Sequence, residues 1–181
     1  ITRSGTSLSA FPELVVNTDP SSSGFGRIEV VAMDSTTALV FYEDEQNSGA
    51  RTLKVMLRTG TALTMGAATV LNAPAAHVTM AALDSISAIV CYQKISESVC
   101  AIVARSGTAL SVGTELQIST EGGYLHVVRA ISSNVAIFCY WGYIGGGNKV
   151  LCTVLSRSAA VLTKGVNWYR PLPPTNFLSL A

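Results

Sequence analysis

The chain has 181 residues, of which 49% are hydrophobic and 13% are charged, and its net charge is +1. So small a charge, with no cluster of lysine or arginine, gives no electrostatic basis for binding nucleic acid or an anionic membrane. The sequence contains no run of 18 apolar residues, which excludes a transmembrane helix on hydropathy grounds.

Most of the chain consists of repeats about 50 residues long, a period typical of repeat architectures. Three segments align without a gap: IEVVAMDSTTALVFYE at 28–43, VTMAALDSISAIVCYQ at 78–93 and HVVRAISSNVAIFCYW at 126–141. A second block follows in step at 58–66, 105–113 and 157–165, and a fragment of it, RSGTSLSAF, occupies 3–11.

Each repeat is predicted to contain four short strands. In the first repeat these are residues 28–33, 38–43, about 51–58 and a last strand from Leu63. β-branched and aromatic residues favour strands, and the runs are too short for helices. Asp34 begins the first turn, and Gly60-Thr61 forms a tight hairpin turn. A glycine interrupts the fourth strand of each repeat, which indicates a bulge or bend: Gly66, Gly113 and Gly165.

Four strands in about 50 residues are typical of a β-propeller blade, so the predicted fold is an all-β propeller, with a two-sheet β-sandwich as the alternative. The single repeat domain, 1–181, divides into a partial blade 1–27, blades 28–76, 77–123 and 124–168, and a proline-rich connector with the start of a next strand, 169–181. Three and a half blades do not close a ring. We therefore expect either a longer chain or a ring built from several copies, of which two would supply seven blades.

The four cysteines occupy matching positions in two repeats. The predicted hairpins place them opposite each other as Cys91 with Cys100 and Cys139 with Cys152. This arrangement permits a cross-strand disulfide in each repeat. The favoured interpretation is nevertheless a small buried apolar residue, because the first repeat has Phe41 and Leu53 there and free cysteine is commonly buried.

The block TGTALTMGAATVLN at 59–72, together with ALDSISAIVCYQ at 82–93, resembles repeats of bacteriophage tail-fibre and other virion structural proteins. Similar repeats occur in bacterial surface and secreted proteins. The resemblance covers residues 1–165 and implies a β-propeller in a virion or surface appendage, without implying catalytic residues. The third repeat departs most, with Ser132 in place of the aspartate and Ala159 in place of the turn glycine.

One arginine recurs in every copy of the second block, as Arg3, Arg58, Arg105 and Arg157. Because it is present in all copies, we interpret it as structural. Its planar guanidinium could pair with the turn acids Asp34 and Asp84, or contact the edge of a neighbouring blade.

The sequence offers little for catalysis. It has no G-x-S-x-G elbow, calcium loop or phosphate-binding loop. His77 and His126 fall at different repeat positions and do not recur with cysteines at metal-ligand spacing. The only acidic cluster, at 43–45, is interpreted as a solvated loop tip. We therefore expect no enzyme activity, no metal and no cofactor.

The loop after the second strand of the third repeat differs from its counterparts, since it carries aromatic residues among glycines. Trp141, Tyr143 and Asn148 lie in it, and Tyr124 and His126 are candidates to extend the same surface. Aromatic side chains there could stack on a sugar ring or anchor a protein partner. Packing of Trp141 under the loop or against another subunit is the alternative.

These observations together predict a non-enzymatic structural and binding module of a virion or surface appendage: a phage tail, fibre or capsid-decoration protein. Its expected partners are other copies of itself, other virion proteins and possible host-surface glycans, with no nucleic acid and no membrane insertion. The expected location is a virion, the extracellular space or a cell surface. A carbohydrate-binding propeller lectin is the alternative function.

Overall fold

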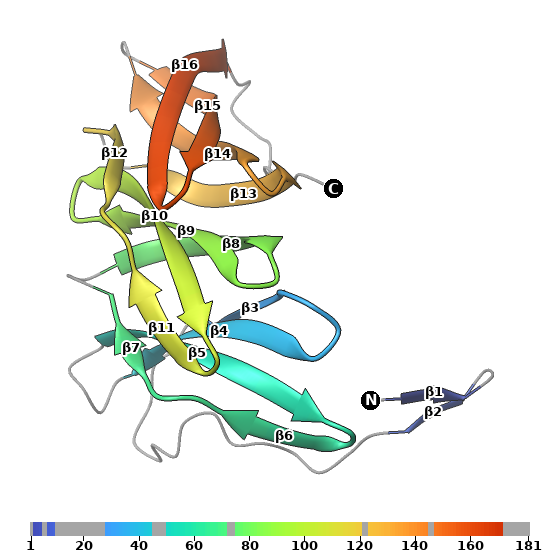
Figure 1. The fold of residues 1–181 in the computed structure, drawn as a ribbon. Helices are drawn as coiled ribbons and strands as arrows, with labels where there is room; N and C mark the ends of the chain where they lie inside the picture. The colour runs from blue at the N-terminus through green and yellow to red at the C-terminus, as the bar shows by residue number, and fades with distance from the viewer. Residues whose placement is uncertain are drawn as a thin grey trace.

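The computed structural model of the chain describes residues 2–4, 7–9, 28–44, 50–71, 75–120, 123–144 and 147–171. Throughout these residues the only regular structure is the β-strand, so the predicted all-β class is confirmed. Figure 1 shows that the strands gather into three large sheets arranged one above another.

Each sheet is an antiparallel meander of consecutive strands. The first sheet contains β3 (Ile28–Ala32), β4 (Thr37–Asp44), β5 (Ala50–Thr59), β6 (Ala62–Met65) and β7 (Thr69–Val70). The second contains β8 (Ala75–Asp84), β9 (Ser87–Lys94), β10 (Glu97–Ser106), β11 (Ala109–Val112) and β12 (Leu116–Ser119). The third contains β13 (Tyr124–Ser132), β14 (Val135–Ile144), β15 (Gly147–Ser158) and β16 (Val161–Pro171).

The fourth strand is broken in two of the sheets. β6 and β7 both pair with β5, and β11 and β12 both pair with β10. The break in the first sheet falls at Gly66, where a Cβ atom would lie 2.5 Å from the carbonyl oxygen of Thr108 in the second sheet. Glycine therefore lets this bend approach the neighbouring hairpin closely.

The last hairpin has the same register in all three sheets, and the short hairpin of β1 (Thr2–Ser4) and β2 (Ser7–Ser9) shares it. The arginine pairs with a leucine in every case: Arg3 with Leu8, Arg58 with Leu63, Arg105 with Leu110 and Arg157 with Leu162. The first turn residue has positive φ, at 59° in Gly60, 61° in Gly107 and 54° in Ala159. A type II′ turn requires this conformation, which glycine adopts most easily.

The middle sheet is buried on both faces, because its side chains alternate between two cores. Ala88, Val90 and Tyr92 of β9 belong to the core shared with the first sheet. Ile89 and Cys91 of the same strand belong to the core shared with the third sheet. This double burial explains why the strand is continuously apolar instead of alternating.

The interpretation of the cysteines as free apolar residues is wrong. Cys91 is bonded to Cys100 and Cys139 to Cys152, and both pairs have Cα atoms 4.1 Å apart. Directly opposed residues of an antiparallel pair come this close only at positions that do not exchange backbone hydrogen bonds. The strand register therefore brings the sulfur atoms together.

The third sheet extends further than the sequence predicted. A connector was expected to begin at Tyr169, but β16 continues to Pro171 because residues 169–171 pair with 149–151 of β15. The three described sheets form an open stack, and no barrel or ring closes among them.

Candidate functional site: the junctions between sheets

An arginine joins the second sheet to the first, and another joins the third sheet to the second. At the first junction, Nη2 of Arg105 on β10 lies 2.9 Å from Oδ2 of Asp34, in the turn between β3 and β4. The same guanidinium donates through Nε to the carbonyl oxygen of Ser85, 2.6 Å away, in its own sheet. Arg105 therefore ties the turns of two adjacent sheets together.

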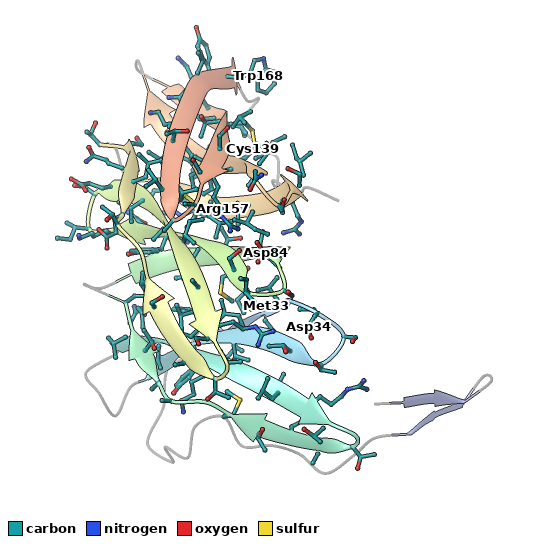
Figure 2. All side chains as sticks on the ribbon, viewed as in Figure 1. Met33, Asp34, Asp84, Cys139, Arg157 and Trp168 are labelled. Atoms are coloured by element: carbon teal, nitrogen blue, oxygen red, sulfur yellow. A yellow bond between two sulfur atoms is a disulfide. The ribbon has the colours of Figure 1, made fainter. Side chains whose placement is uncertain are left out.

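The second junction has the equivalent contact. Nη1 of Arg157 lies 2.8 Å from Oδ2 of Asp84, and Figure 2 shows the two residues adjacent at the boundary between β15 and the β8–β9 turn. Arg157 also donates to the hydroxyl of Ser87. We call the two contacts, Arg105–Asp34 and Arg157–Asp84, the arginine latches.

The aspartate of each latch uses its two oxygens for different tasks. Oδ1 of Asp34 accepts from the backbone N–H of Thr36 at 2.7 Å, and Oδ1 of Asp84 accepts from that of Ile86 at 2.9 Å. These bonds close the turn within the sheet, which leaves Oδ2 for the next sheet. One residue type therefore shapes the turn and carries the junction.

Hydrogen bonding keeps both carboxylates ionised. The backbone N–H of Thr36 is the largest influence that lowers the pKa of Asp34. For Asp84, burial opposes ionisation, but hydrogen bonds from Ser87 and Arg157 outweigh it and lower the pKa to about 2. The latches are therefore fully charged at neutral pH.

The third sheet has no acceptor of this kind. Ser132 stands in the place of the aspartate, and its hydroxyl accepts from the N–H of Asn134 at 3.3 Å, so the turn is kept. The first sheet has the arginine but no acceptor for it: Arg58 is exposed, and the described part of the chain holds no side-chain partner for it. The side chain of Arg3 lies outside the described residues.

A second polar contact recurs between the first strands of the sheets. Oε1 of Glu29 accepts from the backbone N–H of Met80 at 2.8 Å, and the hydroxyl of Thr79 accepts from that of Val128 at 3.3 Å. Glu29 and Thr79 occupy the same repeat position, where the third repeat has Val127. The outward face of the third sheet therefore lacks both kinds of acceptor.

The predicted aromatic surface is assembled in part. Tyr124 and Trp141 are cross-strand partners with ring centroids 5.9 Å apart, and Tyr124 is 50% exposed. His77 of the second sheet meets the Tyr124 ring edge-on at 5.3 Å. The side chains of Tyr143 and Asn148, and those of the acidic residues 43–45, lie outside the described residues.

His126 has a different environment from the rest of this surface. It is 7% exposed, and its ring lies 5.2 Å from that of Phe138 and 6.1 Å from that of Tyr140. Its Nε2 lies 3.2 Å from the hydroxyl of Ser98 in the second sheet. His126 thus contributes to packing between the second and third sheets.

Two pockets at the junctions were not predicted. The one between the first and second sheets has a volume of about 410 Å³ and is lined by Tyr92, Lys94 and Glu115 among others. The one between the second and third sheets has a volume of about 340 Å³ and is lined by Tyr140, Lys164 and Asn167 among others. Tyr92 and Tyr140 are repeat equivalents, and so are Glu115 and Asn167.

In the pocket between the first and second sheets, the charged side chains pair with each other. The hydroxyl of Tyr92 donates to Oε1 of Glu115 at 2.5 Å, and Nζ of Lys94 lies 2.7 Å from Oε2. Burial raises the pKa of Glu115, but bonds from Lys94 and Tyr92 outweigh it and lower that pKa. Burial, and then Glu115, raise the pKa of Tyr92 above its ordinary value.

One sequence signal could have located these pockets. Glu115 and Asn167 each lie two residues after the glycine of the second block, whereas the first repeat has Ala68 there. Because the polar character does not recur in all three repeats, it is a weak signal in the sequence alone. The tyrosine that ends the second strand does recur, as Tyr42, Tyr92 and Tyr140.

Other kinds of site receive no support from the described residues. They include no group of three or more histidine, cysteine, aspartate or glutamate side chains placed to hold a metal ion. Within the same ranges, no helix has the length and hydrophobicity needed to cross a membrane.

No protein-family model, curated protein or solved structure matches this chain significantly. The function must therefore be argued from the sheets, their junctions and the resemblance of the repeats.

Proposed function

We propose that the chain is a non-enzymatic structural module of a virion or surface appendage, that its sheets are blades of a β-propeller, and that it acts through protein–protein assembly. The observation that carries the proposal is the arginine latch, which repeats at both junctions between a guanidinium nitrogen and Oδ2 of the turn aspartate: Arg105 to Asp34 and Arg157 to Asp84. A contact that recurs between successive sheets is typical of a module built by stacking identical units.

The arrangement of the strands supports the propeller. The first strands of adjacent sheets, β3, β8 and β13, contact one another, as the innermost strands of blades do. Each sheet also packs face to face on the next through an apolar core. A ring needs more blades than three, so the missing blades would come from further chain or from other copies.

The proposed location rests on two features. Disulfides persist in oxidising surroundings such as virion and cell surfaces, and both cysteine pairs of this chain are bonded. The resemblance of the repeats to virion structural proteins agrees with such a location.

Two experiments test this proposal. Negative-stain electron microscopy of the purified protein, with its mass measured by light scattering, should show rings of a defined number of blades. Gold-labelled antibodies against the chain should decorate virions or appendages in preparations from the source organism. Open, non-annular particles would contradict the propeller, and labelling confined to the cell interior would contradict the location.

A lectin is the second candidate, favoured by the exposed Tyr124 and its partly buried neighbour Trp141. Aromatic faces of this kind stack on sugar rings. A glycan array probed with the protein and with Trp141→Ala tests it. Glycan binding that the substitution removes would support the lectin, and an array without any bound glycan would leave assembly as the function.

A further inference from the structure

The pocket between the second and third sheets has the size of a small-ligand site. Its volume of about 340 Å³ lies within the range of pockets that enclose small molecules, roughly 300–1,000 Å³. β12 of the second sheet forms one wall, and β14 and β16 of the third sheet form the other. A ligand here would contact both sheets at once.

The walls carry hydrogen-bonding groups suited to hydroxyls. Gln117, Ser119 and Thr120 line one side, and Asn167 lines the other. Amide and hydroxyl side chains donate and accept at the same time, which matches the hydroxyl groups of a sugar. Tyr140, which is itself buried, also lines this site.

The charge of this pocket differs from that of its equivalent at the first junction. Lys164 contributes a positive charge, and its Nζ donates to the carbonyl oxygen of Ile118 at 2.8 Å, which fixes the ammonium across the junction. None of the described lining residues is acidic. In the equivalent pocket Val112 replaces this lysine, and Glu115 balances Lys94.

We propose that this pocket binds a saccharide that carries a carboxylate group. The carboxylate pairs with Lys164, and the sugar hydroxyls bond to the amides and hydroxyls of β12 and β16. The pocket shares no lining residue with the Tyr124–Trp141 pair, and the inference goes beyond the proposed assembly role.

The test is titration calorimetry of the whole protein with methyl glucuronide, methyl glucoside and acetate. We expect saturable binding of the glucuronide alone, and about tenfold or greater loss of affinity in Lys164→Gln, since a charge-assisted hydrogen bond is removed. Lys164→Arg keeps the charge and should retain binding. Lys149→Gln, elsewhere on the third sheet, makes the same charge change and should bind as the unaltered protein does.

Several results would overturn the proposal: no saturable binding of the glucuronide, equal binding of the glucoside, equal binding of acetate, or full affinity in Lys164→Gln. Circular dichroism of each variant shows whether it is folded, and the arginine variant separates the charge from the shape of the site. The oligomeric state of the protein is measured by light scattering in the same sample that is used for calorimetry. If the protein formed no rings, the proposed function would be contradicted, but measured binding of the glucuronide to this pocket would still hold.

Discussion

Arg157 of the third sheet lies 2.8 Å from Asp84 of the second, and Arg105 makes the same contact with Asp34 one sheet earlier. The partners are about 70 residues apart in sequence, at 73 and 71 positions. The latches therefore hold neighbouring sheets together at their turn ends, where the apolar cores end.

Removal of one latch should destabilise the stack modestly. We expect Asp84→Asn to lower the free energy of unfolding by roughly 1–2 kcal/mol, because a partly exposed ion pair and its hydrogen bonds are lost. Urea unfolding of Asp84→Asn, Arg157→Gln and the double variant gives the coupling between the two residues. A coupling of zero would show that the contact contributes nothing to stability.

The Arg157–Asp84 latch should also make the free energy of unfolding depend on pH. The pKa of Asp84 is about 2 in the folded chain, against an ordinary 3.8. A group whose pKa is lowered by folding contributes stability that is complete above its unfolded pKa and is lost as the pH falls through the folded value. Between pH 4 and pH 2, the unaltered protein should therefore lose about 1–2 kcal/mol more than Asp84→Asn does. Parallel curves for the two proteins would contradict this assignment.

The two disulfides should differ in their resistance to reduction. Cys91 and Cys100 are fully buried in the core between the second and third sheets, whereas Cys152 is partly exposed. Reduction requires access of a thiolate to a sulfur atom. Alkylation followed by mass spectrometry, at rising reductant concentration, should detect Cys139 and Cys152 before Cys91 and Cys100. Release in the opposite order would show that burial does not govern access here.

The tyrosine at the first junction should matter through its hydroxyl group. Tyr92 donates to the Glu115 carboxylate, so Tyr92→Phe should lower the free energy of unfolding by about 1.5–3 kcal/mol, as expected for a hydrogen bond to a charged group. Tyr42→Phe is the matched control, because Tyr42 occupies the same repeat position and its hydroxyl bonds no group within the described ranges. Equal effects of the two substitutions would contradict the role of this bond.

The strand pattern was predictable because it depends on local sequence. β-branched runs, the turn aspartate and the Gly-Thr hairpin act within a few residues, and each of them occurs in more than one repeat. β4 and β5 accordingly lie close to their predicted positions at 38–43 and about 51–58. The outer limit of β16 was missed because the pairing of 169–171 with β15 overrides a proline-rich sequence that favours a connector.

The disulfides and the junction pockets could not be predicted from local sequence. The alignment put Phe41 at the position of Cys91 and so favoured an apolar role, although the register that opposes Cys91 to Cys100 was foreseen. The pocket of Tyr92, Lys94 and Glu115 depends on how β9 meets the segment after β11. Contacts of this kind depend on the packed sheets, and their one local signal is the polar residue two positions after the glycine, Glu115 or Asn167.

The latches give the stack a polarity. Between sheets, the guanidinium groups of Arg105 and Arg157 pair with the preceding sheet. The first sheet therefore offers Arg58 as a donor on its outer side, while the third sheet has Ser132 and no carboxylate at the turn that would receive an arginine. The sheets are therefore not interchangeable, since exchanging the second and third would place Ser132 next to Arg105, which pairs with an aspartate. Beyond holding neighbours together, the latches specify which sheet follows which.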